Sequence, residues 1–152
     1  MKNEKIQVAI LKELLKETPH VSYYIDEDDF VVVVLNGTVG YRMAADKLCV
    51  SLEGVQTSMA LQEICDSLML NVPLTPTDYY RKDGKARMYR ADDRDNQPIY
   101  IDTGLLACFD HPQLYQTAYH PLRPVIVTET QIGVDAPEIV GIVMPVRVLE
   151  EE

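Results

Sequence analysis

The stretch that decides the fold is LRPVIVTETQIGVDAPEIVGIVMPVRVL, residues 122–149. Three runs rich in β-branched residues can be read in it: Val125–Thr128, Gln131–Val134 and Ile139–Val148. Both gaps are short enough for hairpins, and the Asp, Pro and Glu of the second gap are typical of turns. The stretch therefore predicts a three-stranded antiparallel meander. Its last run is almost wholly apolar, which indicates burial on both faces, and Pro145 should end that strand because proline donates no ladder hydrogen bond.

A second sheet signal lies nearer the start of the chain. Three apolar runs follow one another there: Val21–Ile25, Phe30–Leu35 and Thr38–Met43. The last two are joined by Asn36-Gly37, a strong hairpin signal because a type I′ turn needs positive φ at both central residues. The middle run, FVVVVL, has no polar alternation, so we expect that strand to be buried on both faces.

Apolar residues at helical spacing predict two or three helices. Residues 3–17 form the first, an amphipathic helix. Its apolar stripe consists of Ile6, Ile10 and Leu14, widened by Leu11 and Leu15. Met59–Leu70 is predicted to form a second helix, and Gly104–Phe109, capped by Asp102 or Thr103, a short third one.

The middle of the chain is predicted to hold a connector and a second hairpin. Val72–Thr77 contains two prolines and reads as a connector. Arg87–Arg90 and Ile99–Asp102 read as paired strands, and Tyr115–Pro124 as a connection into the final meander. Together these patterns predict a single α+β domain over residues 1–152, mostly antiparallel sheet with two or three helices.

Composition excludes several classes of protein. No run approaches the roughly 20 apolar residues of a membrane span, and Met1–Lys5 is polar, so we expect no membrane segment, no signal peptide and a cytoplasmic location. The three cysteines are odd in number and widely spaced, which indicates reduced thiols. No GxGxxG or GxxxxGK pattern is present, so no cofactor is expected.

The charge of the chain is unevenly distributed. A net charge of −10 argues against a wholly basic nucleic-acid binder. Six of the 14 basic residues nevertheless fall between Arg81 and Arg94. Four aspartates in or beside that segment balance them in part, so its simplest interpretation is a solvated hairpin.

Patterns of catalytic and metal-binding residues are weak. His111 and His120 each precede a proline, and their spacing does not indicate convergence on a nucleophile. Asp110 beside His111 would act as an acid–base pair only if both side chains faced one cleft. The acidic turn at residues 26–29 resembles part of a calcium loop, but it lacks the glycine and distal glutamate that close such a site, so no metal site is predicted.

The run Val143–Arg147, VMPVR, resembles the carboxyl end of the bacterial DNA polymerase sliding clamp, where a final strand enters a Met-Pro-Met-Arg ending. The predicted strand, short helix and meander before it are similar to the second half of a clamp domain, and the first helix and hairpin to the first half. The resemblance implies a DNA-clamp-like domain with a pocket for short peptides near its last strand. Clamp chains hold three such domains and this chain has room for one, so a ring would require a homo-oligomer.

The resemblance also implies two sets of site residues. The peptide pocket would be lined by Met144, Pro145, Val146 and Arg147, where Val146 replaces a methionine. The DNA backbone would be contacted, without base reading, by basic residues of the first helix and of the basic segment: Lys5, Lys12, Lys16, Arg81, Lys82, Lys85 and Arg87.

Three functions follow for comparison with the structure. The leading one is a non-enzymatic interaction module that binds a protein peptide and DNA backbone. The first alternative is an accessory protein of the phage or mobile-element type, which binds another protein through an apolar patch without DNA. The second alternative is a small enzyme that uses Asp110, His111 and His120.

Overall fold

The structure, a computed structural model, describes residues 1–57, 63, 72–91, 98–116, 124–130 and 136–146. One α-helix, two 3-10 turns and nine strands have bounds within them. The helix is α1 (Asn3–Leu14), and the turns are η1 (Ala45–Lys47) and η2 (Thr103–Leu106). The strands are β1 (Val21–Ile25), β2 (Phe30–Leu35), β3 (Val39–Ala44), β4 (Val72–Arg81), β5 (Ala86–Ala91), β6 (Ile99–Asp102), β7 (Gln113–Gln116), β8 (Val125–Glu129) and β9 (Glu138–Val143).

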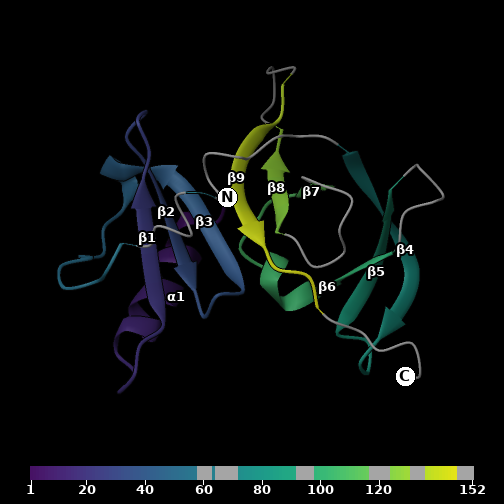
Figure 1. Cartoon of the computed structure of the whole chain (residues 1–152), viewed down its shortest axis with the longest axis horizontal. Helices are drawn as coiled ribbons and strands as arrows, with labels where there is room; N and C mark the ends of the chain where they lie inside the picture. The colour runs from purple at the N-terminus through teal and green to yellow at the C-terminus, as the bar shows by residue number, and fades with distance from the viewer. Residues whose placement is uncertain (58–62, 64–71, 92–97, 117–123, 131–135, 147–152) are drawn as a thin grey trace.

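All nine strands belong to one antiparallel sheet. Their order is β1-β2-β3-β9-β8-β7-β4-β5-β6. β1–β3, backed by α1, lie at one end of the molecule, and β4–β6 lie at the other end (Figure 1). β9 pairs with β3 on one side and with β8 on the other. It therefore joins β1–β3 to the rest of the sheet.

The sheet also closes on itself at its far end. Beyond β9 the chain continues through Met144 and Pro145, and the N–H of Val146 donates to the carbonyl oxygen of Tyr100 in β6 over 2.7 Å. Because β6 is the last strand in the order, this bond links β9, β8, β7, β4, β5 and β6 into a ring. Pro145 ends β9 as predicted, and the backbone then switches partners from β3 to β6.

The hairpins near the start of the chain are confirmed. Asn36 and Gly37 both have positive φ, 55° and 65°, as the type I′ turn requires. Alternate residues of β2 face opposite sides of the sheet: Val31 and Val33 pack in the main core with Ile6 and Ile10 of α1, whereas Val32 packs with Ile142. The middle strand is therefore buried on both faces, which is why it carries no polar alternation.

The predicted α+β class is wrong. α1 is the only α-helix whose bounds are described, Glu63 being a single helical residue apart from it, and the architecture is predominantly a nine-stranded antiparallel sheet. The third predicted helix is only the 3-10 turn η2, although Asp102 does cap it, accepting from the Gly104 N–H at 2.9 Å. The second, Met59–Leu70, lies outside the described residues apart from Glu63.

A segment predicted as a connector is a strand. Val72–Thr77 forms the first part of β4 despite Pro73 and Pro76. β7 pairs with β4 only from Val72 to Leu74, and a bulge in the β4–β5 pairing follows Pro76. Pro73 therefore lies near the start of β4, and Pro76 lies where the edge of β4 that faces β7 has no paired strand. Strand starts, uncovered edges and bulges are the places where sheets accept proline.

The predicted meander is corrected as well. β8 and β9 pair directly, with Val125 opposite Val143 and Ile126 opposite Ile142. A meander would place the run Gln131–Val134 between them, and that run lies outside the described residues. The error arose because three β-branched runs in sequence do not specify which of them are neighbours.

Candidate functional site

The outward face of α1 is apolar. Val8, Leu11 and Leu15 have 50%, 47% and 76% of their surface exposed, whereas Ile6 and Ile10 are fully buried against the sheet. At about 100° per residue, the three exposed side chains fall on the side of the helix opposite the buried pair. A surface helix normally carries polar residues there, so this outer stripe (Val8, Leu11, Leu15) is unusual for a helix whose only role is structural.

The apolar stripe predicted to face the core from the first helix is therefore wrong in part. Leu11 and Leu15 lie outside the core, and Glu13 is buried in their place. The Glu13 carboxylate accepts from the Lys16 ammonium and from the His20 N–H, so it ties the end of the helix to the start of β1. These bonds compensate for burial of the charge.

A shallow hollow lies along the same helix. It has a volume of about 430 Å³ and is lined by Glu4, Lys5, Val8, Ala9 and Lys12. Lys5 and Lys12 thus flank the outer stripe with positive charge, while Lys16 is engaged with Glu13. The hollow combines an apolar floor with a cationic rim.

The second candidate surface is the hairpin of β4 and β5. Its strands are in register at Pro76 opposite Tyr89 and again at Tyr80 opposite Arg87, so β4 holds two more residues than β5 between these pairs. Hydrogen bonds hold this bulge: the Thr77 hydroxyl donates to the carbonyl oxygen of Met88 at 2.9 Å, and Arg87 Nε donates to the Thr77 carbonyl oxygen at 2.8 Å. Bulges of this kind re-aim side chains and are common next to functional sites.

The bulge presents two aromatic side chains to solvent. Tyr79 and Tyr80 are 46% and 43% exposed. The guanidinium carbon of Arg81 lies 5.2 Å from the ring centre of Tyr79, and that of Arg87 lies 5.5 Å from the ring centre of Tyr80. Both distances are within the range of cation–π attraction.

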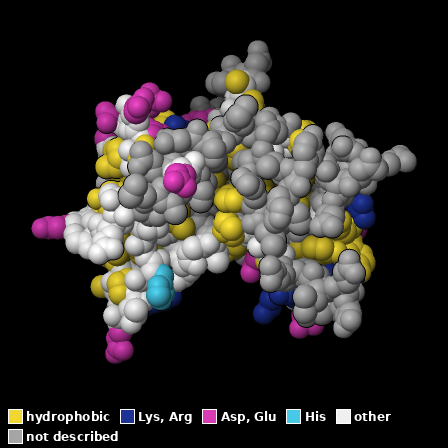
Figure 2. Space-filling view, viewed as in Figure 1, with side chains coloured by type: hydrophobic (Ala, Val, Ile, Leu, Met, Phe, Trp, Pro, Cys, Tyr) yellow, Lys and Arg dark blue, Asp and Glu magenta, His cyan; other side chains and the backbone are white. Residues whose placement is uncertain are grey.

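The end of the hairpin is basic. The turn contains three successive residues with positive φ, Lys82, Asp83 and Gly84, and exposes the side chains of Lys82 and Lys85. Residues 78–90 contain five basic and two acidic side chains, a local charge of +3 in a chain of −10. Figure 2 shows Lys and Arg side chains gathered with hydrophobic ones at the end of the molecule that holds β4 and β5.

The structure does not bring the two predicted DNA-binding groups together. Lys5, Lys12 and Lys16 are on α1, whereas Arg81–Arg87 are in the β4–β5 hairpin at the opposite end of the molecule's long axis (Figure 1). A single ligand contacting both groups would have to span the whole sheet. Tyr79 and Tyr80 were not among the site residues predicted from the sequence, although two tyrosines next to a basic run are a signal for such a surface.

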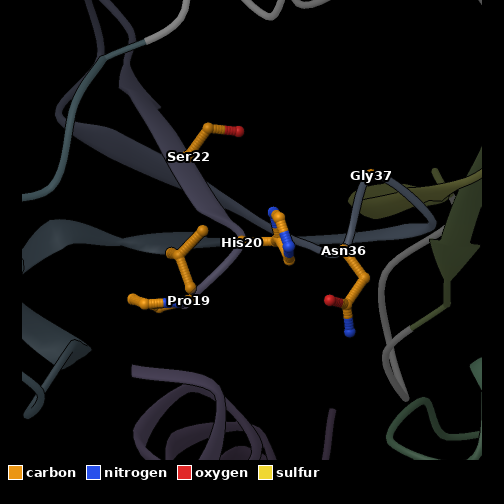
Figure 3. A pocket seen from close by; sticks show the side chains of 6 residues that line it. Pro19, His20, Ser22, Asn36 and Gly37 are labelled. Carbon is orange, nitrogen blue, oxygen red and sulfur yellow. The ribbon is translucent and has the colours of Figure 1, made fainter. Parts of the chain in front are cut away.

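A third concave site lies where α1 leads into β1. It measures about 570 Å³ and is lined by Pro19–Ser22 and Asn36-Gly37. Figure 3 shows His20 and Asn36 side by side, with Ser22 further along the strand. The polar groups here serve the fold: the Asn36 N–H donates to the His20 carbonyl oxygen, and Glu13 accepts from the His20 N–H. The bond from Lys16, with the one from the His20 N–H, holds the pKa of Glu13 below its ordinary value despite burial.

Of the residues of the enzyme hypothesis, Asp110 lies against the chain's first residue. The amino group of Met1 contacts Asp110 Oδ2 at 2.9 Å and Glu129 Oε1 at 2.7 Å, and Glu129 Oε2 accepts from the Asp110 N–H. The hydrogen bond from the amine holds the pKa of Asp110 below its usual range. Burial lowers the pKa of the amine, but its hydrogen bonds to Glu129 and Asp110 outweigh this and raise it. His111 is exposed nearby, and His120 lies outside the described residues.

The predicted peptide pocket maps to the segment after β9. Met144, Pro145 and Val146 are half-buried, and the Met144 N–H donates to the Thr38 carbonyl oxygen at 2.8 Å. Their backbone is thus used to join β9 to its neighbours. Arg147 lies outside the described residues, and the role of these four residues in peptide binding stays a prediction.

No group of three His, Cys, Asp or Glu side chains that could hold a metal ion is found in the described part of the chain. In the same part, no helix is long and apolar enough to cross a membrane. Comparison with known proteins gives no match to a family model, a curated protein or a solved structure.

Proposed function

We propose that this protein is a non-enzymatic interaction module that binds a helical peptide of a protein partner through the outer stripe of α1. The observation that carries the proposal is the exposure of Val8, Leu11 and Leu15 on the side opposite the core. Covering three half-exposed aliphatic side chains contributes on the order of 3 kcal/mol before the cost of association is subtracted. A partner that covers them would form a weak, reversible complex.

The charge beside the stripe indicates the chemistry of the partner. Lys5 and Lys12 flank the apolar floor of the hollow, and Glu4 is the only acid that lines it among the described residues. At physiological ionic strength charges more than about 8 Å away are largely screened, so distant acidic residues act only weakly on this surface. An amphipathic helix with an apolar stripe and acidic flanks matches this surface in the helix-in-groove mode.

The earlier expectations fit this proposal to different degrees. A peptide partner was the leading expectation, and the site proposed for it is now α1. The accessory-protein alternative agrees with it, since that alternative also relies on an apolar patch. The free thiols of Cys49 and Cys108 support a cytoplasmic location, where thiols stay reduced.

The test is a titration with a designed peptide. An 18-residue fluorescein-labelled helix with leucines at i, i+3, i+4 and i+7 and glutamate flanks is followed by fluorescence anisotropy. We expect saturable binding that weakens at least tenfold in the double variant Leu11→Ser/Leu15→Ser. Ile25→Ser is the matched control, because Ile25 is 49% exposed but lies on β1.

Two results would count against the proposal. Equal affinity of the wild type and the double variant would show that the stripe is not the binding surface. A dimer in light scattering that becomes a monomer in the double variant would show that a second copy of the chain, rather than a partner peptide, covers the stripe.

A further inference from the structure

The β4–β5 hairpin has the parts of a site for an unstacked, negatively charged chain. Tyr79 and Tyr80 are neighbours in sequence, which in a regular strand would face opposite sides. In the bulge both are exposed, by 46% and 43%. Neither ring is part of the hydrophobic core, so each is available to a flat ligand.

Arginine side chains lie beside both rings. Arg87 lies beside the Tyr80 ring and holds the bulge through its bond to the Thr77 carbonyl oxygen. Its contact to the fully exposed Asp78 spans 4.0 Å and is weak in water. Arg87 therefore positions the ring while keeping most of its charge available.

Arg81 is the stronger indication of an anionic ligand. Its Nε–H is shielded from solvent and has no acceptor, and none of the ion pairs between described residues includes Arg81. A buried donor without an acceptor costs stability, so such groups call for an explanation. A phosphate bound beside the Tyr79 ring would supply the anionic partner that this guanidinium lacks among the described residues.

The ligand that matches rings and cations together is a single-stranded nucleic acid. Proteins that bind single strands without base reading combine a positive groove along the backbone with aromatic side chains on which bases stack. A duplex keeps its bases stacked inside, so it offers phosphates but no base faces to Tyr79 and Tyr80. We propose that the β4–β5 hairpin binds single-stranded nucleic acid, with bases stacked on Tyr79 and Tyr80 and phosphates on Arg81, Lys82, Lys85 and Arg87.

This inference is independent of the proposed function. The hairpin lies at the opposite end of the molecule from α1 (Figure 1). Substitutions in the hairpin therefore test nucleic-acid binding without disturbing the outer stripe of α1, and substitutions in the stripe leave the hairpin unchanged. The sequence predicted DNA-backbone contacts from the lysines of α1 and from the basic hairpin. The inference keeps only the hairpin as a nucleic-acid site.

The experiment measures the anisotropy of a fluorescein-labelled 20-nucleotide oligodeoxythymidine at 50–200 mM salt. Stacking on an aromatic ring predicts that Tyr79→Ala and Tyr80→Ala each weaken binding at least about fivefold. Tyr79→Phe and Tyr80→Phe keep the rings and should bind within about twofold of wild type. Four phosphate contacts predict a slope of log K against log salt of about −3, reduced by about 0.7 in Arg81→Gln.

The controls separate the site from general electrostatics. Lys47→Gln removes one exposed charge from η1, beside β3, and should leave the affinity unchanged. A 20-base-pair duplex should bind at least about tenfold more weakly than the single strand, because it cannot use the rings.

Three results would overturn the inference. The first is no saturable binding of the single strand at 50 mM salt. The second is unchanged affinity in the Tyr79→Ala/Tyr80→Ala double variant while its melting temperature stays that of the wild type. The third is equal affinity for the duplex, which would reduce the hairpin to a general polyanion contact.

Discussion

Gly141 offers the sharpest test of how the two ends of the sheet are joined. It lies in the middle of β9, opposite Tyr41 of β3 on one side and Val127 of β8 on the other. A Cβ added there would overlap the backbone carbonyl oxygen of Gly40 and would lie 2.8 Å from Phe109 Cζ. The Phe109 ring can turn aside, but the carbonyl oxygen of a central strand cannot move without disturbing the β3–β9 pairing.

The expected cost of Gly141→Ala follows from this difference. Overpacking a core typically costs about 1–3 kcal/mol, and a clash with backbone lies at the upper end of that range. For a chain of 152 residues, a loss of about 3 kcal/mol lowers the melting temperature by about 10 °C. Gly40→Ala is the matched comparison, because its nearest obstacles are side-chain atoms, Ile142 Cγ1 at 2.8 Å and Val34 Cγ2 at 3.1 Å, and not backbone. We expect it to cost less than half as much.

The assay is thermal and urea unfolding of both variants, followed by circular dichroism. Adding Phe109→Leu to Gly141→Ala should restore little stability, since the backbone contact with Gly40 remains. If Gly141→Ala melts within 2 °C of the wild type, β9 does not run against β3 as described.

Three further predictions concern buried and paired groups. Val33→Asp should abolish cooperative melting in circular dichroism, because Val33 is fully buried and an unpaired charge there costs several kcal/mol; a cooperative transition near the wild-type temperature would contradict the burial of β2. The pKa of the Met1 amine is raised above its ordinary value of 8.0, so its ion pairs stabilise the fold fully below pH 8.0 and this contribution is lost as pH rises through the raised pKa. Urea unfolding between pH 6 and 10 should show that loss in the wild type and a smaller one in Glu129→Gln, whereas identical profiles would show that the amine–Glu129 pair is not formed. The pKa of Glu13 is lowered from 4.5, so the stability contributed by its carboxylate is present above pH 4.5 and is lost as pH falls through the lowered pKa. Glu13→Gln should therefore be less stable than the wild type at neutral pH and should lose less stability in acid. An acid unfolding profile unchanged by the substitution would contradict the bonds of Glu13 to Lys16 and His20.

Local signals in the sequence were sufficient for the N-terminal strands and for the hairpin that pairs β5 with β6. The Asn36-Gly37 turn specifies both the connection between β2 and β3 and their register, so the pairing of these strands can be predicted without any distant contact. The pairing of β3 with β9 joins residues about a hundred positions apart. Nothing in either strand alone identifies the other as its neighbour.

Prolines and helix faces account for most of the remaining errors. Pro73 and Pro76 were interpreted as breakers because their effect depends on which edges of β4 are covered, and only the assembled sheet determines that. The stripe of α1 was misassigned because Leu11 and Leu15 fit the apolar pattern as well as the buried residues do. The sequence shows that a helix is amphipathic, but it does not show that an apolar side chain is left for a partner.

The most direct test of the account is nuclear magnetic resonance of the ¹⁵N-labelled protein titrated with the acidic amphipathic peptide. We predict shift changes along α1, centred on Val8, Leu11 and Lys12, and none at Met144–Val146 or in the β4–β5 hairpin. Changes confined to the segment after β9, with α1 unaffected, would contradict the central claim that the outer stripe of α1 is the surface that binds the protein partner.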